Sequence, residues 1–180
     1  MLIPNHVTNY SIWKDATRLI GMADVTLMDL KNLEDPLKGS GIFGEVAMPV
    51  QCHFQAYSVR LKWLTVYDHA VLATIQDGAL LTAMVAQQLH DSGTNRIVHQ
   101  GWRYVMGTAP KGFNFGKLEV GTKGDAETEY ELISLRVIRA DENGNDQIML
   151  EVDKENAICR WWDGFQLVDN ARRIRQLIGI

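Results

Sequence analysis

The sequence predicts a mainly β protein with antiparallel pairing, and three local patterns carry that prediction. In the expected strand at 52–64, residues 57–63 alternate strictly between apolar and polar side chains, as expected for a strand with one buried and one wet face. Asn143 and Gly144 stand together between two apolar runs, which is the strongest short hairpin signal. A second turn signal at 91–94 separates two more strand-like runs. We therefore expect a two-sheet antiparallel sandwich or barrel with one flanking helix.

The N-terminal part of the chain should contain one strand and one long loop. Residues 16–26 form the expected strand, with Leu19, Ile20 and Val25 as its apolar anchors. Residues 27–49 hold three glycines and two prolines and show no clean period. Loops of this length in small domains usually bind something, so we expect 27–49 to be an extended assembly loop.

The strand at 52–64 has the clearest sidedness. Its core face carries the larger apolar side chains, Tyr57, Val59, Leu61 and Trp63. Its water-facing side carries Ser58, Arg60 and Lys62. A short flanking helix is expected next, at 68–76, because Asp68 can cap its start and Gly78 can end it.

The middle of the chain is expected to form a long hairpin. The alanines and glutamines of 80–89 fit a helix, but the turn signal that follows favours a strand. The run at 96–108 is the partner strand, and one of its faces carries Val98, Trp102, Tyr104 and Met106. Residues 111–124 are rich in glycine and lysine and are expected to be a second loop.

The C-terminal part should complete a single domain spanning residues 1–180. Strands at 128–140 and 147–152 flank the Asn-Gly turn. Three carboxylates fall on one face at the start of the first strand, where a solvated edge or a partner contact is expected: Glu127, Glu129 and Glu131. An amphipathic helix or arm follows at 167–177, inside a C-terminal arm at 164–180.

Residues 39–44 have the G-x-G-x-x-G spacing of a nucleotide-binding loop, but their surroundings do not fit one. Such a loop requires a strand before the glycines and a helix after them. Pro36 interrupts a strand on one side, and Pro49 cuts short a helix on the other. We therefore interpret the glycines as permissive backbone positions in an exposed loop, and we expect no nucleotide cofactor.

Composition excludes several classes of function. The net charge of −4 indicates no general affinity for nucleic acid. No apolar run reaches membrane-spanning length and the first residues lack the form of a signal peptide, so we expect a cytosolic protein without membrane insertion. Cys52 and Cys159 lie far apart in sequence and are expected to be buried thiols rather than a disulfide.

Motif spacing shows no catalytic or metal-binding constellation. The five histidines form no tight ligand pair. The acidic turn at 141–146 resembles a calcium loop, but Val152 stands where the last ligand is required. Neighbouring Trp161 and Trp162 should point to opposite faces of a strand, which favours one buried ring and one interface ring over a sugar site. We expect neither an enzyme nor a protein that binds a metal or cofactor.

A β-rich domain with a long loop and no catalytic site suggests self-assembly. Edge strands carry unpaired backbone groups, which neighbouring subunits can cover. Head-to-tail pairing around an axis closes a ring whose inner wall is a continuous sheet. The face of Ser58, Arg60 and Lys62 suits such a water-lined wall, and the loop 27–49 would reach the next ring.

A set of short segments follows in order along nearly the whole chain: 3–5, 9–10, 24–30, 38–45, Trp63, 112–121, 127–131, 153–156 and 172–180. In this order they resemble the major tail tube proteins of contractile-tailed bacteriophages, the family found in myovirus tails and tailocins. The segment 38–45 corresponds to the glycine loop of that family. No single segment is decisive, and the ordered set carries the resemblance.

The resemblance implies a fold similar to the type VI secretion tube, and hexameric rings stacked into a hollow tube. The implied partners are further copies of the chain, a contractile sheath protein, a baseplate initiator and a tape-measure protein, while DNA passes through the lumen without specific binding. The implied location is the virion, after assembly in the host bacterial cytoplasm. As ring-to-ring contacts the resemblance points to Gly39, Gly41, Ile42, Phe43 and Gly44. As C-terminal contacts it points to Arg172, Arg173 and Ile174.

Two alternatives and one question stay open. The chain would equally suit the tube of a DNA-free contractile device, such as a tailocin or an injection system. A monomeric β-barrel that binds a small ligand is the alternative of another class, and it requires an enclosed apolar cavity. The positive charges of Arg60 and Lys62 leave the charge of the lumen open, because a DNA conduit is easier to explain with a non-sticky wall.

Overall fold

Antiparallel strands make up most of the computed structural model, which describes residues 1–15, 17–19, 22–41, 43–64, 78–117, 119–120, 124–140 and 146–179. In these residues the elements are β1 (Leu2–Lys14), β2 (Thr17–Leu19), β3 (Met22–Thr26), β4 (Asn32–Leu37), β5 (Val46–Phe54), β6 (Ser58–Trp63), β7 (Ala79–Asp91), β8 (Arg96–Asn114), β9 (Ala126–Ala140), β10 (Gln147–Asp153), β11 (Ile158–Trp162), β12 (Leu167–Asp169) and the helix α2 (Arg172–Ile178). The prediction of a mainly β, antiparallel fold is confirmed.

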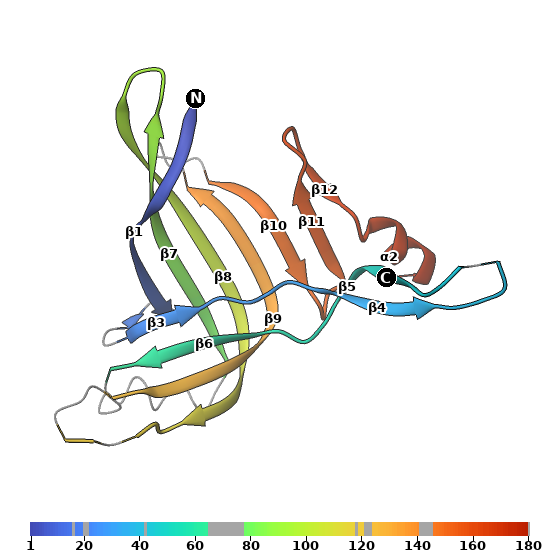
Figure 1. Cartoon of the computed structure of the whole chain (residues 1–180), viewed down its shortest axis with the longest axis horizontal. Coiled ribbons are helices and arrows are strands. Elements are labelled where there is room, and N and C mark those ends of the chain that lie inside the picture. The colour runs from blue at the N-terminus through green and yellow to red at the C-terminus, as the bar shows by residue number, and fades with distance from the viewer. Residues whose placement is uncertain are drawn as a thin grey trace.

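The main sheet bends over on itself because β9 has two partners along one edge. The described strands follow the order β12-β11-β10-β9-β8-β7-β1-β2, and β6 joins β9 to β3. The first half of β9 pairs with β6, and its second half pairs with β10. The strands β3 and β6 therefore cross the long strands β1 and β7, as Figure 1 shows.

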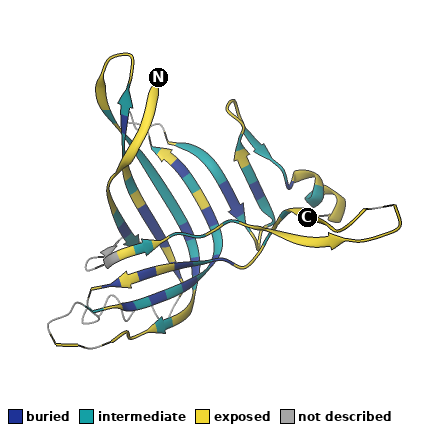
Figure 2. Ribbon diagram, in the orientation of Figure 1, coloured by how far each residue is buried: buried dark blue, intermediate teal, exposed yellow. Residues whose placement is uncertain are grey.

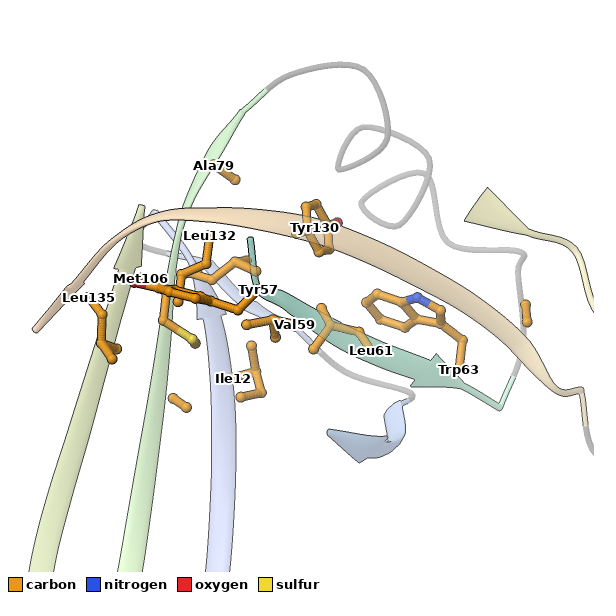
Figure 3. Close-up of a cluster of buried hydrophobic side chains, with 13 residues drawn as sticks. Ile12, Tyr57, Val59, Leu61, Trp63, Ala79, Met106, Tyr130, Leu132 and Leu135 are labelled. Carbon is orange, nitrogen blue, oxygen red and sulfur yellow. The ribbon is translucent and has the colours of Figure 1, made fainter. Parts of the chain in front are cut away.

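The core lies between these two layers. Alternation along β6 buries Val59, Leu61 and Trp63 completely, and Tyr57 just before the strand is also buried. From the opposite layer they meet Ile12 and Met106 (Figure 3). Leu81 of β7 belongs to the same cluster. The buried face predicted for this strand is therefore confirmed.

Both predicted hairpins are present. In the first, β7 and β8 pair from Ala79 opposite Thr108 to Asp91 opposite Arg96, which confirms the strand at 80–89. In the second, β9 pairs with β10. The strand β8 continues to Asn114, so the start of the predicted loop at 111–124 is wrong. The helix predicted at 68–76 and the turn residues 141–145 lie outside the described residues.

The N-terminal strand β1 is an addition to the prediction. Most side chains of β1 are exposed, and Ile12 is its buried residue. Burial therefore hardly alternates along the strand, and no amphipathic period marks it in the sequence. The single strand predicted at 16–26 is two strands. Of these, β2 folds back on β1 while β3 crosses to β6.

The segment 27–49, predicted to be a loop, is largely a hairpin. The strands β4 and β5 form a separate two-stranded ribbon, which we call the arm (residues 32–54). It projects from the body of the molecule in Figure 1. The prediction treated Pro36 as a strand breaker, but each strand of a two-stranded ribbon has a free side where a missing N–H breaks no ladder. The strand predicted as continuous over 52–64 is interrupted at 55–57, where the arm joins β6.

The C-terminal segment packs against the end of the main sheet as β11, β12 and α2, which we call the C-terminal module (residues 158–178). The helix or arm predicted at 167–177 begins as β12 and becomes helical at Arg172. No helix within the described residues is long and apolar enough to cross a membrane.

Candidate assembly surfaces

One face of the arm is apolar and uncovered. Leu37 stands opposite Val46, and Asp35 stands opposite Met48, so the alternation of β4 and β5 brings a set of large side chains to the same face. Each is 42–52% exposed: Leu33, Leu37, Val46, Met48 and Val50. Pro36 and Ala47 form part of the other face.

Such an arm needs a partner. A two-stranded ribbon is marginally stable by itself in water, and contiguous exposed apolar surface marks an interaction site. Figure 2 shows the arm exposed along almost its whole length, together with the first half of β1. In that half of β1, between Leu2 and Ser11, the described residues provide no strand on the edge opposite β7. The arm and this edge are therefore the two candidate assembly surfaces.

The tip of the arm holds the predicted ring-to-ring residues. Gly41 and Gly44 have φ angles of 92° and 109°, which other residues rarely adopt, so the interpretation as permissive backbone positions is confirmed there. Phe43 between them is fully exposed. An ion pair of 2.9 Å between Lys38 Nζ and Glu45 Oε2 closes the base of the tip. Gly39 is also exposed, and Ile42 lies outside the described residues.

The predicted wet face of β6 carries an unbroken series of paired charges. Arg60 lies 3.6 Å from Glu127 and 3.5 Å from Glu129, which is also 3.2 Å from Lys111. The series continues through Glu131 to Lys154. We call these six alternating residues the zigzag: Glu127, Arg60, Glu129, Lys111, Glu131 and Lys154.

Ser58 and Glu129 link the zigzag to the predicted wall. A hydrogen bond from Ser58 is the largest of the causes that lower the pKa of Glu129, followed by a hydrogen bond from Lys111 and the charges of Arg60 and Lys111. Lys62 lies on the same face, opposite Glu127 on one side and Asp24 on the other. Ser58, Arg60 and Lys62 thus share one exposed surface, as predicted.

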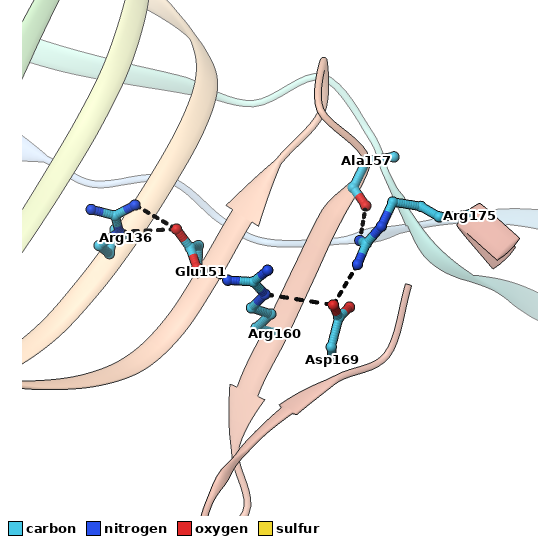
Figure 4. Close-up of polar contacts among 6 residues, drawn as sticks. All are labelled: Arg136, Glu151, Ala157, Arg160, Asp169 and Arg175. Atoms are coloured by element: carbon cyan, nitrogen blue, oxygen red, sulfur yellow. Dashed lines mark hydrogen bonds and ion pairs between the residues drawn. The ribbon is translucent and has the colours of Figure 1, made fainter. Parts of the chain in front are cut away.

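A second series of charges fastens the C-terminal module to the main sheet (Figure 4). Arg136 donates two hydrogen bonds to Glu151 Oε1, at 2.5 and 3.0 Å, and Arg160 donates a third to Oε2 at 3.2 Å. Arg160 also lies 3.6 Å from Asp169, which Arg175 bonds from the helix. Each step joins adjacent strands, so the series runs across β9, β10, β11, β12 and α2.

Asp169 depends on its arginine neighbours. Burial tends to raise its pKa, but the hydrogen bond and charge of Arg175 and the charge of Arg160 outweigh burial and hold the pKa below its usual range. A carboxyl whose pKa is lowered by folding stabilises the fold above its ordinary pKa. That stabilisation is lost as the pH falls through the folded value.

The predicted C-terminal contact residues lie next to Arg175 in the sequence but do not include it, although Arg175 is the residue that anchors α2. Arg172 and Arg173 are exposed on α2, and Ile174 is half-buried. The sequence prediction missed Arg175, which bonds Asp169 and the carbonyl of Ala157. This stretch holds three arginines, Arg172, Arg173 and Arg175, and no sequence signal separates the anchored one from the other two.

Glu151 was also missed, although a signal for it exists. Counting outward from a two-residue turn at Asn143-Gly144 places Arg136 opposite Glu151, and the structure reaches the same pair through a register shift between Ile148 and Leu150. The side chain of Glu151 is 9% exposed, whereas its two arginine partners are 49% and 37% exposed. Glu151 is therefore the buried centre of this series.

Replacing Glu151 with glutamine is expected to lower the free energy of unfolding by about 1–3 kcal/mol, the usual cost of losing a charged hydrogen-bond partner. The exposure of Arg136 and Arg160 lets water solvate them, so the cost stays below that of a fully buried pair. Urea unfolding measures it. Glu155→Gln, at an exposed turn position, is the control and should change stability by less than about 0.5 kcal/mol. Equal midpoints for the two variants would contradict the role of Glu151.

The two cysteines come together although they are distant in sequence. Both are free thiols; Cys159 is buried in β11 and Cys52 is half-buried at the base of the arm, so the expectation of thiols is confirmed. Burial, together with a hydrogen bond and charge from Cys159, raises the pKa of Cys52. The contact joins the base of the arm to β11 of the C-terminal module.

Two further sequence predictions concern chemistry. Trp161 is exposed and Trp162 is half-buried, so the expectation that one ring is buried is wrong. Their strand, β11, lies near the end of the main sheet, next to the three-residue strand β12. Within the described residues, no group of three or more histidine, cysteine or acidic side chains is placed to hold a metal.

Within the described residues, an exposed apolar arm, a strand edge with no neighbouring strand and a surface of paired charges are the features of an assembly subunit. The chain belongs to the phage tail tube protein FII family, whose model matches residues 4–179. It is therefore a tail tube protein by family, as the sequence resemblance predicted. No curated protein matches the chain.

Solved structures that the chain is similar to include parts of contractile injection systems. The sheath/tube terminator of the extracellular contractile injection system PVC matches at 14% identity and a TM-score of 0.49, over 77% of this chain and 97% of that chain. The sheath-tube complex of PVC matches at 11% identity and a TM-score of 0.47, over 71% and 86%. The baseplate of the anti-feeding prophage AFP matches at 10% identity and a TM-score of 0.46, over 71% and 89%.

Proposed function

We propose that this chain is the structural subunit of the inner tube of a contractile tail. Copies assemble into hexameric rings, and the rings stack into a hollow conduit for delivery of the genome into the host. The family match over residues 4–179 supports the tube assignment. The observation that carries self-assembly is the uncovered apolar face of the arm, because a soluble subunit that stayed alone would leave that face in water.

In this proposal the arm joins one ring to the next. A neighbouring copy covers Leu37, Val46 and Met48, and the tip with Phe43 reaches furthest from the body of the subunit. Within a ring, a strand of the neighbouring copy pairs with the free edge of β1. This pairing satisfies backbone groups that a single subunit leaves exposed.

The remaining predicted residues take roles consistent with this arrangement. The face of Ser58, Arg60 and Lys62 lines the lumen, and Arg172, Arg173 and Ile174 on α2 make C-terminal contacts with other subunits. The partners are the contractile sheath, a baseplate initiator and a tape-measure protein. The subunit assembles in the bacterial cytoplasm and becomes part of the virion.

Negative-stain electron microscopy of the purified chain at high concentration, with light scattering alongside, tests the proposal. Stacked rings or hollow tubes are the expected result, with six subunits resolved in end-on views. Closed rings of another symmetry would contradict the hexamer. If particles remain monomeric even when a baseplate initiator is added, self-assembly fails. The apolar groove of about 240 Å³ lined by Val7, Tyr10, Ile12, Val25, Leu27, Ala83, Val85 and Tyr104 would then be tested for a small ligand.

A further inference from the structure

The zigzag contributes little to stability, so its purpose lies elsewhere. Its five ion pairs span 3.2–3.7 Å, and its side chains are 26–54% exposed. Exposed pairs of this kind contribute little to stability, because water and salt screen their charges. The same strands could have carried neutral polar side chains at no cost to the fold. The arrangement is therefore better explained by what it does to the surface than by what it does to the core.

The zigzag leaves its surface without net charge. Each of its three cations faces at least one carboxylate, and Arg60 and Lys111 each face two. Beside it, Lys62 stands opposite Glu127 and Asp24 in the register of the strands. Four cations and four carboxylates thus alternate over β3, β6, β9 and their neighbours.

This surface also differs from those expected to contact other subunits. The arm and the free half of β1 expose large apolar side chains, such as Met48 and Val7. The exposed side chains of β6 are Arg60 and Lys62, and its apolar ones are buried. A surface whose charges are already paired gains little from a protein partner, since binding would remove those charges from water. It is therefore suited to face water in the assembled protein.

We infer that the zigzag makes this face a charge-balanced wall, over which nucleic acid passes without binding. The inference rests on the proposed tube and deepens it by naming the ion pairs that keep nucleic acid from binding to this face. Nucleic acid binds proteins mainly because lysine and arginine neutralise its phosphates and release counterions. A cation that already faces a carboxylate offers less of this gain, whereas an all-acidic wall would repel the same cargo.

The zigzag also bears on the charge of the lumen, which the positive charges of Arg60 and Lys62 left open in the sequence. Read from sequence, these residues present a positive strip that would hold DNA at every subunit of every ring. In the structure, Glu127, Glu129 and Glu131 from the neighbouring strand oppose that strip. The carboxylates that the sequence placed on one face of β9 therefore have a specific task.

The test uses the full chain and a duplex DNA oligonucleotide. The variant is Glu129→Gln with Glu131→Gln, which removes two carboxylates and keeps side-chain size. It leaves Arg60, Lys111 and Lys154 with fewer partners. The matched control is Glu34→Gln with Glu155→Gln, which changes the net charge equally at exposed positions outside the zigzag. Fluorescence anisotropy measures binding between about 50 and 200 mM salt, the range in which phosphate contacts respond strongly.

The zigzag variant is expected to bind duplex DNA at least about tenfold more tightly than the control at low salt. The slope of log K against log salt should approach about −2, because Lys111 and Lys154 lose their carboxylate partners in the zigzag while Arg60 keeps Glu127. Adding Lys111→Gln to the variant should reduce that slope by about 1. Equal binding by variant and control overturns the inference. So does salt-dependent binding of DNA by the unaltered chain.

The two proposals fail in different ways. Electron microscopy of the same samples reports tubes, whereas anisotropy reports the charge balance of the face. Absence of tubes from the unaltered chain would count against the tube, whatever its affinity for DNA. If the unaltered chain forms normal tubes that bind DNA firmly, the charge-balanced wall is wrong and the proposed tube still stands. Circular dichroism confirms that each variant is folded before it is compared.

Discussion

Replacing Trp63 with alanine is expected to lower the free energy of unfolding by about 3–5 kcal/mol, the range for deleting a large buried aromatic side chain. Trp63 is 0% exposed and belongs to the core cluster between the two layers. Its Nε1 also donates a 2.7 Å hydrogen bond to Thr128 Oγ1, which is itself buried. The substitution therefore creates a cavity and leaves a buried hydroxyl without its donor.

A loss of that size approaches the whole stability of many domains, about 5–15 kcal/mol. Urea unfolding followed by tryptophan fluorescence and circular dichroism measures the change, and the midpoint should fall while the slope stays constant. Thr128→Val separates the hydrogen bond from the cavity and should cost about 1–3 kcal/mol. An unchanged midpoint for Trp63→Ala would show that β6 does not face the core.

Removing the apolar surface of the arm is expected to abolish tube formation while the subunit stays folded. The variant replaces Leu37, Val46 and Met48 with threonine, which favours strands as strongly as the residues it replaces. All three side chains are about half exposed, so the isolated subunit loses little buried area. The contact with the next copy, however, loses its hydrophobic contribution. Light scattering and electron microscopy should show monomers with a melting temperature within a few degrees of the unaltered chain.

The control for the arm lies on its other face. Ala47→Thr with Gln51→Thr changes the same strand on the side away from the apolar residues. It should leave tubes intact. Normal tubes from the triple variant would contradict the assembly role of the apolar face. A second variant distinguishes the role of the apolar face from the role of the tip of the arm. Leu37 and Val46 are direct partners, so an Asn-Gly turn can replace residues 38–45 without disturbing the ribbon.

Local pattern predicted those strands whose two faces meet different surroundings. β6, β7, β8, β9 and β10 each pack one face on the core, and their alternation or turn signals were sufficient to find them. The N-terminal strand and the arm were not found, because most of their side chains are exposed in a single copy. In the proposed tube another subunit covers such strands, and a period based on burial within one chain does not register that contact.

The candidate sites divide in the same way. The sequence indicated that Arg60 and Lys62 share a wet face and that Glu127, Glu129 and Glu131 share another, but it did not indicate that the two sets meet. That meeting depends on β6 pairing with the first half of β9, which follows β6 by more than sixty residues. The contact between Cys52 and Cys159 has the same origin, since it requires the base of the arm to lie against β11.

By itself, the sequence determined the β-rich class, the sidedness of β6, the two hairpins and the absence of recognisable catalytic spacing, because these depend on periods and turns within a few residues. The ordered segments also led to the tail tube family. Only the tertiary structure decided that 27–49 includes most of a ribbon with one apolar face, that Glu151 anchors the C-terminal module, and that the positive strip at Arg60 is neutralised. These features depend on register and on pairing between distant strands, and such pairings are selected by the packing of the whole chain rather than by any local run of residues.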